Sequence, residues 1–281
     1  MLKSVFIVVF LVWCFALVFK GISGIVAGEN LVPWIGILLT SGPMVVFLMR
    51  IMLLKDMART SANLPVVMLL AFVGVALNVQ QTLRAGVDMW FLYNSLGMAG
   101  LFLIYNFWYS RLDRTGSMLK AGQKLPLFSL IDTEGNAVTS DTLRGQPTVM
   151  IFYRGNWCPL CMAQVKEIAN HYNDIKEKGV RTIFVSPQSQ NHTRALAKKF
   201  SVGIEFYRDE GNTAAEALGI VSQFGTPAGM QLLGYDTDTV LPTVVILDAE
   251  GTIVWLHETD NYRVRPEPET FMKVLAEKGL A

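Results

Sequence analysis

Apolar residues dominate the chain before Arg111, and short polar breaks divide this region into four long stretches. Each stretch is close to the roughly 20 residues that a helix needs to cross a bilayer. Tryptophan and tyrosine lie near the expected ends, as is typical of membrane interfaces. The pattern therefore predicts an all-α membrane domain over residues 1–115, with spans at 4–27, 31–54, 64–83 and 89–109.

Two alternatives to these spans are open. The first stretch follows a short basic start at Lys3, as a cleaved signal peptide does, although Val26-Ala27-Gly28 is a poor cleavage site. The other three stretches would otherwise be buried in a soluble core, but their length and near absence of charge disfavour that. We interpret the region as an anchor, since its one cysteine, Cys14, cannot form a transmembrane thiol relay alone and fits a small apolar core residue.

The distribution of basic residues predicts the orientation. The side of the membrane with more lysine and arginine is normally cytoplasmic. An even number of spans places both termini on that side, which predicts a multi-pass cell-membrane protein with its C-terminal domain in the cytoplasm. The richer side holds Lys3, Arg50, Lys55, Arg59, Arg111 and Arg114, and the other holds Lys20 and Arg84.

After residue 120 the pattern changes to alternating strands and helices. A continuous, β-rich apolar run at 148–153 predicts a buried strand, and an amphipathic pattern at 159–178 predicts a helix. A βαβ unit, a hairpin and a closing helix then predict an α/β domain over 120–281, with a mixed sheet and flanking helices. The remaining expected elements are strands at 180–185, 204–207, 244–248 and 253–257, and helices at 192–200, 213–218 and 267–278.

Charge and cysteine content narrow the function. A net charge of +1 gives no reason to expect a nucleic-acid partner. Three cysteines are too few for a disulfide scaffold, so we expect a redox pair and one isolated thiol. The histidines are scattered, and only His257 is a candidate for a copper site. We therefore expect no cofactor and no metal beyond a redox-active disulfide.

The redox pair lies in Trp157-Cys158-Pro159-Leu160-Cys161, between the predicted strand and helix. Unpaired N–H groups at a helix N-terminus favour an anion and lower a cysteine pKa. We therefore expect Cys158 to be the nucleophile and Cys161, one turn later, to be the resolving cysteine. Trp157 would shield one side of the pair, and Pro159 would tune its reduction potential.

The pair and the order of elements resemble the thioredoxin fold over residues 120–281. Two segments, 122–130 (GQKLPLFSL) and 152–161 (FYRGNWCPLC), resemble peroxiredoxin-like redoxins of the alkyl hydroperoxide reductase and thiol-specific antioxidant (AhpC/TSA) superfamily. The resemblance implies that Pro242 is a cis-proline facing the pair and that the Leu241 backbone pairs with substrate. The alternative is an ordinary trans-proline that starts an edge strand. The long segment 222–239, which leads to Pro242, is either a substrate lid or a connecting loop.

The sequence departs from the peroxiredoxin pattern near Cys158. That family places a proline seven residues before the peroxide-attacking cysteine and a threonine or serine three residues before it. Counted from Cys158, these positions hold Ile151 and Gly155. An arginine completes the family's site, and its expected topology points to Arg154, Arg263 or Arg265 as the residue that stabilises the thiolate. For each of them the alternative is a solvated charge.

Three functions remain open. The first is a membrane-anchored thiol–disulfide oxidoreductase, in which Cys158 attacks a disulfide and Cys161 resolves the mixed disulfide. The second is a peroxiredoxin-like peroxidase, in which Cys158 becomes a sulfenic acid and condenses with Cys161. The third is a non-enzymatic module that binds or delivers metal. The expected partners are a protein or small-molecule disulfide or hydroperoxide, an external thiol reductant and a lipid bilayer.

Overall fold

A computed structural model describes residues 1–54, 57–200 and 203–280. The chain divides into two compact units. The helical unit comprises Leu2–Leu54 and Thr60–Arg111. The second unit, called the redoxin unit below, comprises Leu112–Ala281 together with Met1 and the short segment Lys55–Arg59. The basic residue Lys55, which contributes to the predicted orientation, lies outside the described residues.

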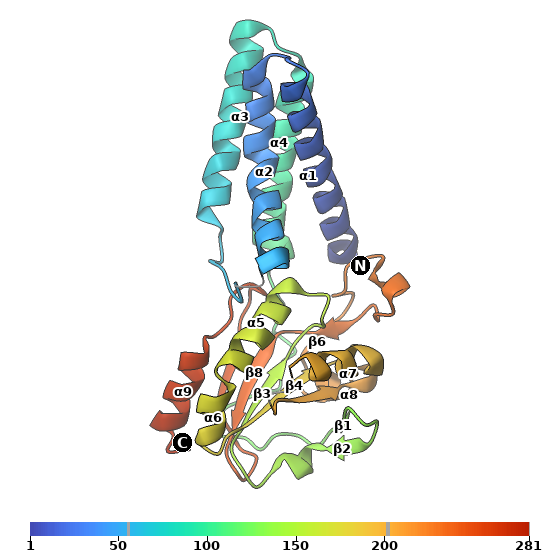
Figure 1. Cartoon of the computed structure of the whole chain (residues 1–281), viewed down its shortest axis with the longest axis vertical. Coiled ribbons are helices and arrows are strands. Elements are labelled where there is room, and N and C mark those ends of the chain that lie inside the picture. Colours follow the sequence, from blue (N-terminus) through green and yellow to red (C-terminus); the bar gives the residue numbers. More distant parts are fainter. Residues whose placement is uncertain (55–56, 201–202, 281) are drawn as a thin grey trace. The chain divides into compact units, whose positions relative to one another are not determined.

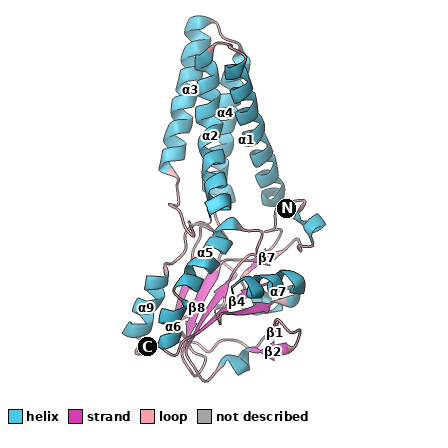
Figure 2. Cartoon of the chain, viewed as in Figure 1, coloured by secondary structure: helices cyan, strands magenta, loops and turns pink. Residues whose placement is uncertain are grey.

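The helical unit contains the four predicted helices (Figures 1 and 2). Three of them, α1 to α3, are long and apolar enough to cross a membrane. The fourth predicted span is divided, because α4 has only 16 residues before the backbone widens into a π-helical turn. The elements are α1 (Leu2–Val26), α2 (Leu31–Leu54), α3 (Pro65–Ala85), α4 (Met89–Ile104) and the π-helical turn (Tyr105–Tyr109).

Small and polar residues fix the packing of α2 against α3 and of α3 against α4. A Cβ atom added at Gly74 would lie 2.5 Å from the carbonyl oxygen of Gly36, so the two backbones approach this closely because Gly74 lacks a side chain. Asn78 on α3 donates to the hydroxyl of Ser95 on α4 at 2.6 Å, and both side chains are fully buried. An apolar helix surface alone would not define this register.

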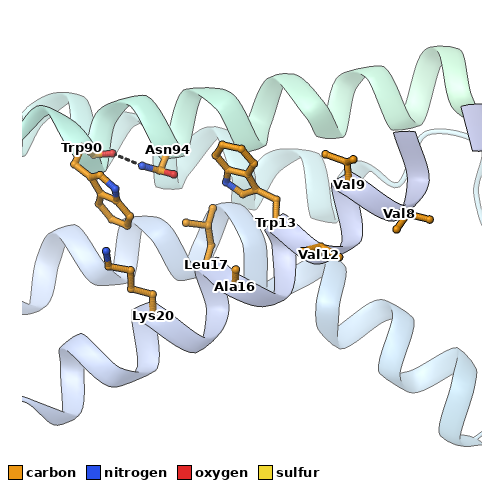
Figure 3. A pocket seen from close by; sticks show the side chains of 9 residues that line it. All are labelled: Val8, Val9, Val12, Trp13, Ala16, Leu17, Lys20, Trp90 and Asn94. Carbon is orange, nitrogen blue, oxygen red and sulfur yellow. Dashed lines mark hydrogen bonds between the residues drawn. The ribbon is translucent and has the colours of Figure 1, made fainter. Parts of the chain in front are cut away.

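An apolar groove of about 460 Å³ runs between α1 and α4 (Figure 3). At one end the ammonium of Lys20 lies 4.3 Å from the centre of the Trp90 ring, and Asn94 donates to the Trp90 carbonyl. Lys20 is the charged residue among those that line the groove, and this cation–π contact pairs it with an aromatic ring at the start of α4. The other lining residues are Val8, Val9, Val12, Trp13, Ala16 and Leu17.

The redoxin unit is built on a mixed seven-stranded sheet with the order β2-β1-β5-β4-β3-β8-β9. The central strand β3 is parallel to β4 and antiparallel to β8, and all five of its residues are buried. The sheet confirms the predicted α/β class. The strands are β1 (Ser129–Ile131), β2 (Ala137–Thr139), β3 (Thr148–Phe152), β4 (Arg181–Ser186), β5 (Glu205–Arg208), β8 (Thr243–Leu247) and β9 (Ile253–Glu258), with a separate pair of β6 (Val221–Ser222) and β7 (Thr239–Val240).

The helix after β3 is interrupted, where the sequence predicted one helix over 159–178. It ends at Asn170, and a second helix starts at Tyr172, because the connecting His171 leaves helical geometry with φ −97° and ψ 7°. In Figure 1, α5, α6 and α9 lie on one side of β3 and β8. The helices are α5 (Pro159–Asn170), α6 (Tyr172–Glu177), α7 (Gln190–Lys199), α8 (Thr213–Ala217) and α9 (Pro268–Glu277).

The core of the redoxin unit fixes the end of β3 from which the dithiol segment leaves. Met150 and Phe152 lie on one face of the sheet in a buried cluster with Ala215 of α8. Residues of β3 alternate between faces, as in any strand, and β3 is flanked on both edges by other strands. A strand held in this way gives the segment that follows Phe152 a rigid starting point.

Candidate active site

The turn between β3 and α5 places both cysteines at the start of a helix. Gly155 has φ +138°, a conformation that side chains rarely adopt, and a Cβ there would meet the Trp157 indole at 2.8 Å. Cys158 is the N-cap of α5, and Pro159 occupies the first turn, where its missing N–H needs no partner. The predicted strand–dithiol–helix junction is therefore present.

The two thiols face each other at this helix start. The N–H of Cys161 donates to the sulfur of Cys158 at 3.4 Å. Both cysteines are free thiols, and both are buried, with exposed fractions of 3% for Cys158 and 0% for Cys161. Cys158 is thus the outer sulfur and Cys161 the inner one.

The guanidinium of Arg265 contacts both sulfurs. Its Nη2 lies 3.3 Å from the sulfur of Cys161 and 3.9 Å from that of Cys158. Its Nη1 donates to Gln164 at 2.7 Å, and its Nε donates to the carbonyl of Tyr262 at 3.3 Å. Because Gln164 lies on α5, the guanidinium is bound to the same helix as the thiols.

The charges around the pair favour one thiolate on the inner sulfur. Burial, the hydrogen bond to Cys161 and the charge of Cys161 raise the pKa of Cys158 well above its usual value. Burial also opposes ionisation of Cys161, but the hydrogen bond from Cys158 and the charge of Arg265 lower its pKa to about 5. A single negative charge shared by two close sulfurs therefore resides on the sulfur nearer the guanidinium.

The other two predicted arginines lie beside the pair. The charge of Arg154 and that of Arg265 both oppose the rise in the pKa of Cys158. The guanidinium of Arg154 stacks 4.7 Å from the Trp157 ring centre and 5.5 Å from that of Tyr262. It also donates to the carbonyl of Gly225. Arg263 is fully buried, with its guanidinium 5.7 Å from the Tyr262 ring centre. Neither is a solvated charge, and Trp157 forms one wall of the site together with Arg154.

The segment between β6 and β7 is attached to the dithiol turn. The hydroxyl of Tyr235 donates to Asn156, and the hydroxyl of Thr239 donates to the carbonyl of Arg154 at 2.8 Å. Gln188 accepts from the N–H of Asn156 at 2.8 Å. Sequence reasoning missed Asn156, Gln188 and Tyr235, since isolated polar residues in loops carry no periodic signal. The one available indication was a tyrosine inside a glycine-bearing loop that leads to the site.

The expectation that Pro242 is a cis-proline is wrong. The described residues contain no cis peptide bond, so the bond before Pro242 is trans, the form that peptide bonds prefer. The Leu241 N–H already donates to the carbonyl of Ile220 at 2.8 Å. Arg114 donates to the Pro242 carbonyl at 2.5 Å. The Leu241 N–H therefore has an internal partner, and the pairing of the Leu241 backbone with substrate stays a prediction.

The described part of the chain brings together no group of three or more histidine, cysteine, aspartate or glutamate side chains suited to a metal ion. His257, the candidate for copper, is half-buried on β9, and burial lowers its pKa. Among the described residues, a metal ion at this site would find two candidate ligands close together, the thiols of Cys158 and Cys161. The metal-delivery alternative stays a prediction.

Comparison with known proteins finds one family repeatedly. Residues 121–256 match the model of the AhpC/TSA family. A chloroplastic peroxiredoxin Q from Sedum lineare is 31% identical over 44% of this chain and 67% of its own length. A putative peroxiredoxin bcp from Coxiella burnetii is 24% identical over 49% of this chain and 88% of its own. The crystal structure of reduced Prx3 from Vibrio vulnificus superposes with a TM-score of 0.50 at 20% identity, over 57% of this chain and 99% of its own.

The matched region has limits that matter for the site. It includes both cysteines but ends before Arg265, and it excludes the helical unit. The chain spans between 58% and 67% of the length of the first plant relatives. The family match therefore says nothing of Arg265, and its position beside the sulfurs is known from the structure alone.

Proposed function

Because this chain belongs to the AhpC/TSA family and is an oxidoreductase, we propose that it is a thiol peroxidase that reduces hydroperoxides at the Cys158–Cys161 pair. The single observation that carries this proposal is the Arg265 guanidinium, which lies 3.3 Å from the sulfur of Cys161 in a buried site. A fixed positive charge stabilises both the thiolate and the negative charge that develops on the leaving oxygen of a peroxide.

The burial of the pair favours a small substrate. The outer sulfur, Cys158, has an exposed fraction of 3%, and the inner one has none. A protein disulfide must bring its own backbone within bonding distance of a sulfur, whereas a peroxide needs an opening of only a few atoms. The internal partner of the Leu241 N–H also disfavours pairing with a peptide there. Both points support the peroxidase over the disulfide reductase.

We assign the attack on peroxide to Cys161, which reverses the order expected from the sequence. Its sulfur is the closer one to Arg265, and its pKa is lowered to about 5. The family pattern also fits this choice better. Three residues before Cys161 stands Cys158, a hydrogen-bonding side chain where the family has a hydroxyl, whereas three before Cys158 stands Gly155.

The proposed cycle balances as follows. The Cys161 thiolate attacks one peroxide oxygen, the O–O bond breaks, and the products are a sulfenic acid and an alkoxide that takes up a proton. The Cys158 thiol then displaces water from the sulfenic acid and forms the disulfide. An external thiol reductant attacks the outer sulfur, Cys158, so that Cys161 departs as a thiolate. A second thiol of the reductant then attacks this mixed disulfide, which releases Cys158 and leaves the reductant as its disulfide. In thiol–disulfide exchange a thiol of low pKa is the better leaving group, and the lowered pKa of Cys161 fits this role.

Stopped-flow rates with hydrogen peroxide and with a model disulfide test the proposal. The reduced full-length chain should react with peroxide on the order of a hundredfold faster than a free thiolate, because the fixed charge acts in a buried site. Its reaction with a model disulfide should show no comparable gain. A peroxide rate no faster than that of a free thiolate, together with a fast disulfide reaction, would instead favour the thiol–disulfide oxidoreductase.

We further infer that the helical unit anchors the enzyme in the cell membrane with the redoxin unit in the cytoplasm. Support comes from three helices long and apolar enough to span a bilayer and from the excess of basic residues on one predicted side. A reporter fused after Ala281 should be active only in its cytoplasmic form. Activity of an exported reporter alone would overturn the orientation and leave the chemistry untouched.

A further inference from the structure

The connection between α2 and α3 contributes to the redoxin unit. The described residues of this connection, 57–59, belong to that unit, although both neighbouring helices belong to the helical unit. Ala58 is buried with an exposed fraction of 4%. The side chain of Arg59 is 25% exposed, so three quarters of its surface is covered. A segment from the N-terminal half of the sequence is therefore part of the domain that carries the thiols.

Arg59 binds α5, the helix that begins at the two cysteines. Its Nη1 donates to one carboxylate oxygen of Glu167 at 3.0 Å, and its Nη2 donates to the other. Glu167 lies on α5, six residues after Cys161. A two-point contact between a guanidinium and a carboxylate fixes direction as well as distance, which a lysine would not do.

The same guanidinium also holds the loop that carries Arg265. Its Nε donates to the carbonyl oxygen of Arg265 at 3.1 Å, and its Nη2 donates to that of Pro266 at 3.2 Å. The side chain of Arg265 has its own partners, which are Gln164, the carbonyl of Tyr262 and the sulfurs. Arg59 holds its backbone, so the two sets of contacts are not redundant.

We propose that Arg59 is a positioning residue, which binds the Arg265 loop to helix α5 and thereby keeps the Arg265 guanidinium on the sulfur of Cys161. Arg59 does not contact either sulfur among the contacts described here; it acts through Arg265. The proposal depends on the geometry of the dithiol site and not on which oxidant the site reduces.

The proposal has a direct electrostatic consequence. The attraction between the guanidinium and the thiolate falls with their separation, and it is strong because both groups are buried. A loop freed from Arg59 samples positions farther from Cys161. The thiolate then loses part of its stabilisation, and the pKa of Cys161, which is about 5 in the intact site, rises.

The test is the pH dependence of Cys161 alkylation in the full-length reduced chain, with iodoacetamide as probe and peptide mass spectrometry to identify the modified residue. Arg59→Met should raise the apparent pKa of Cys161 by about one unit. This is less than the full effect of removing a neighbouring charge, because Arg265 stays near the sulfur. Arg59→Lys should give an intermediate shift, because it keeps the charge and loses the two-point contact.

Arg181→Met is the matched control. Arg181 binds Glu205 through two donors, at 2.5 Å each, and is covered to a similar degree. It pairs in register with Thr148, at the opposite end of β3 from the dithiol. Its loss should lower the unfolding midpoint as the loss of Arg59 does, but should leave the alkylation profile of Cys161 unchanged.

A double variant shows whether Arg59 acts through Arg265. If it does, adding Arg59→Met to Arg265→Met produces no further shift in the alkylation pKa, because the charge to be positioned is gone. The proposal is overturned if Arg265→Met shifts the profile and Arg59→Met does not, or if the two shifts simply add. Since no peroxide is used, this outcome is independent of a failure of the peroxidase proposal.

Discussion

Replacing Cys161 with serine is expected to abolish the reaction with hydrogen peroxide, whereas replacing Cys158 with serine should leave the first oxidation within about tenfold of the native rate. The hydrogen bond from Cys158, which a serine hydroxyl can also donate, and the charge of Arg265 lower the pKa of the inner sulfur, so we expect Cys161 to be the stronger nucleophile at neutral pH. Without Cys158 the sulfenic acid has no resolving thiol. It should accumulate on Cys161, where a dimedone adduct and mass spectrometry detect it.

The opposite result has a clear meaning. A sulfenic acid that accumulates on Cys158 in the Cys161→Ser variant, with no peroxide reaction in Cys158→Ser, would restore the order of roles expected from the helix position alone. Cys14→Ser serves as the control for general thiol reactivity. This third cysteine is fully buried in the helical unit, so its replacement should alter neither rate.

Replacing Arg265 with methionine is expected to slow peroxide reduction at pH 7 by roughly thirtyfold or more, since a cysteine without assistance is only a few per cent ionised there. The sign with pH follows from the direction of the shift. In the native site the pKa of Cys161 is lowered to about 5, so the rate should be flat near neutrality and fall only in acid. In the variant, burial remains while the compensating charge is lost, so the rate should climb with pH through and beyond neutrality.

Arg265→Lys separates charge from geometry. A lysine keeps a positive charge but cannot reach Gln164 and the sulfurs together, as the guanidinium does with Nη1 and Nη2. Its rate should fall between the native and methionine values. If the methionine variant keeps a flat native profile, Arg265 does not supply the stabilising charge, and the assignment of the attacking sulfur loses its main support.

Much of the fold was predictable because buried elements show a characteristic pattern of apolar residues in the sequence. The buried strand β3 reads as a continuous apolar run, and α1 to α3 read as bilayer-length stretches. The proximity of Cys158 and Cys161 was also predictable, because two cysteines this close in sequence at a strand-to-helix turn lie close together in any fold of this kind. The break at His171 was not visible, since the apolar stripe continues through it.

Contacts between distant parts of the chain could not be predicted. The sequence named three arginines as equal candidates, and only folding shows that Arg265 meets the sulfurs while Arg154 packs on Trp157. The order of roles proposed for the two thiols rests in part on a difference of 0.6 Å in their distance from one guanidinium, 3.9 Å against 3.3 Å. Arg59 is separated from Glu167 by 108 positions, so no local pattern indicates the pair.

The attachment of Lys55–Arg59 to the redoxin unit bears on how this enzyme should be handled. A fragment that begins at Leu112 would omit the apolar helices and be easier to purify, and it would retain Arg265 and both cysteines. It would nevertheless lack Arg59 and expose the carboxylate of Glu167 without its partner. Kinetic constants from the fragment would then describe a loosened site, and a weak peroxidase measured in this way would be a result of the truncation rather than a property of the enzyme.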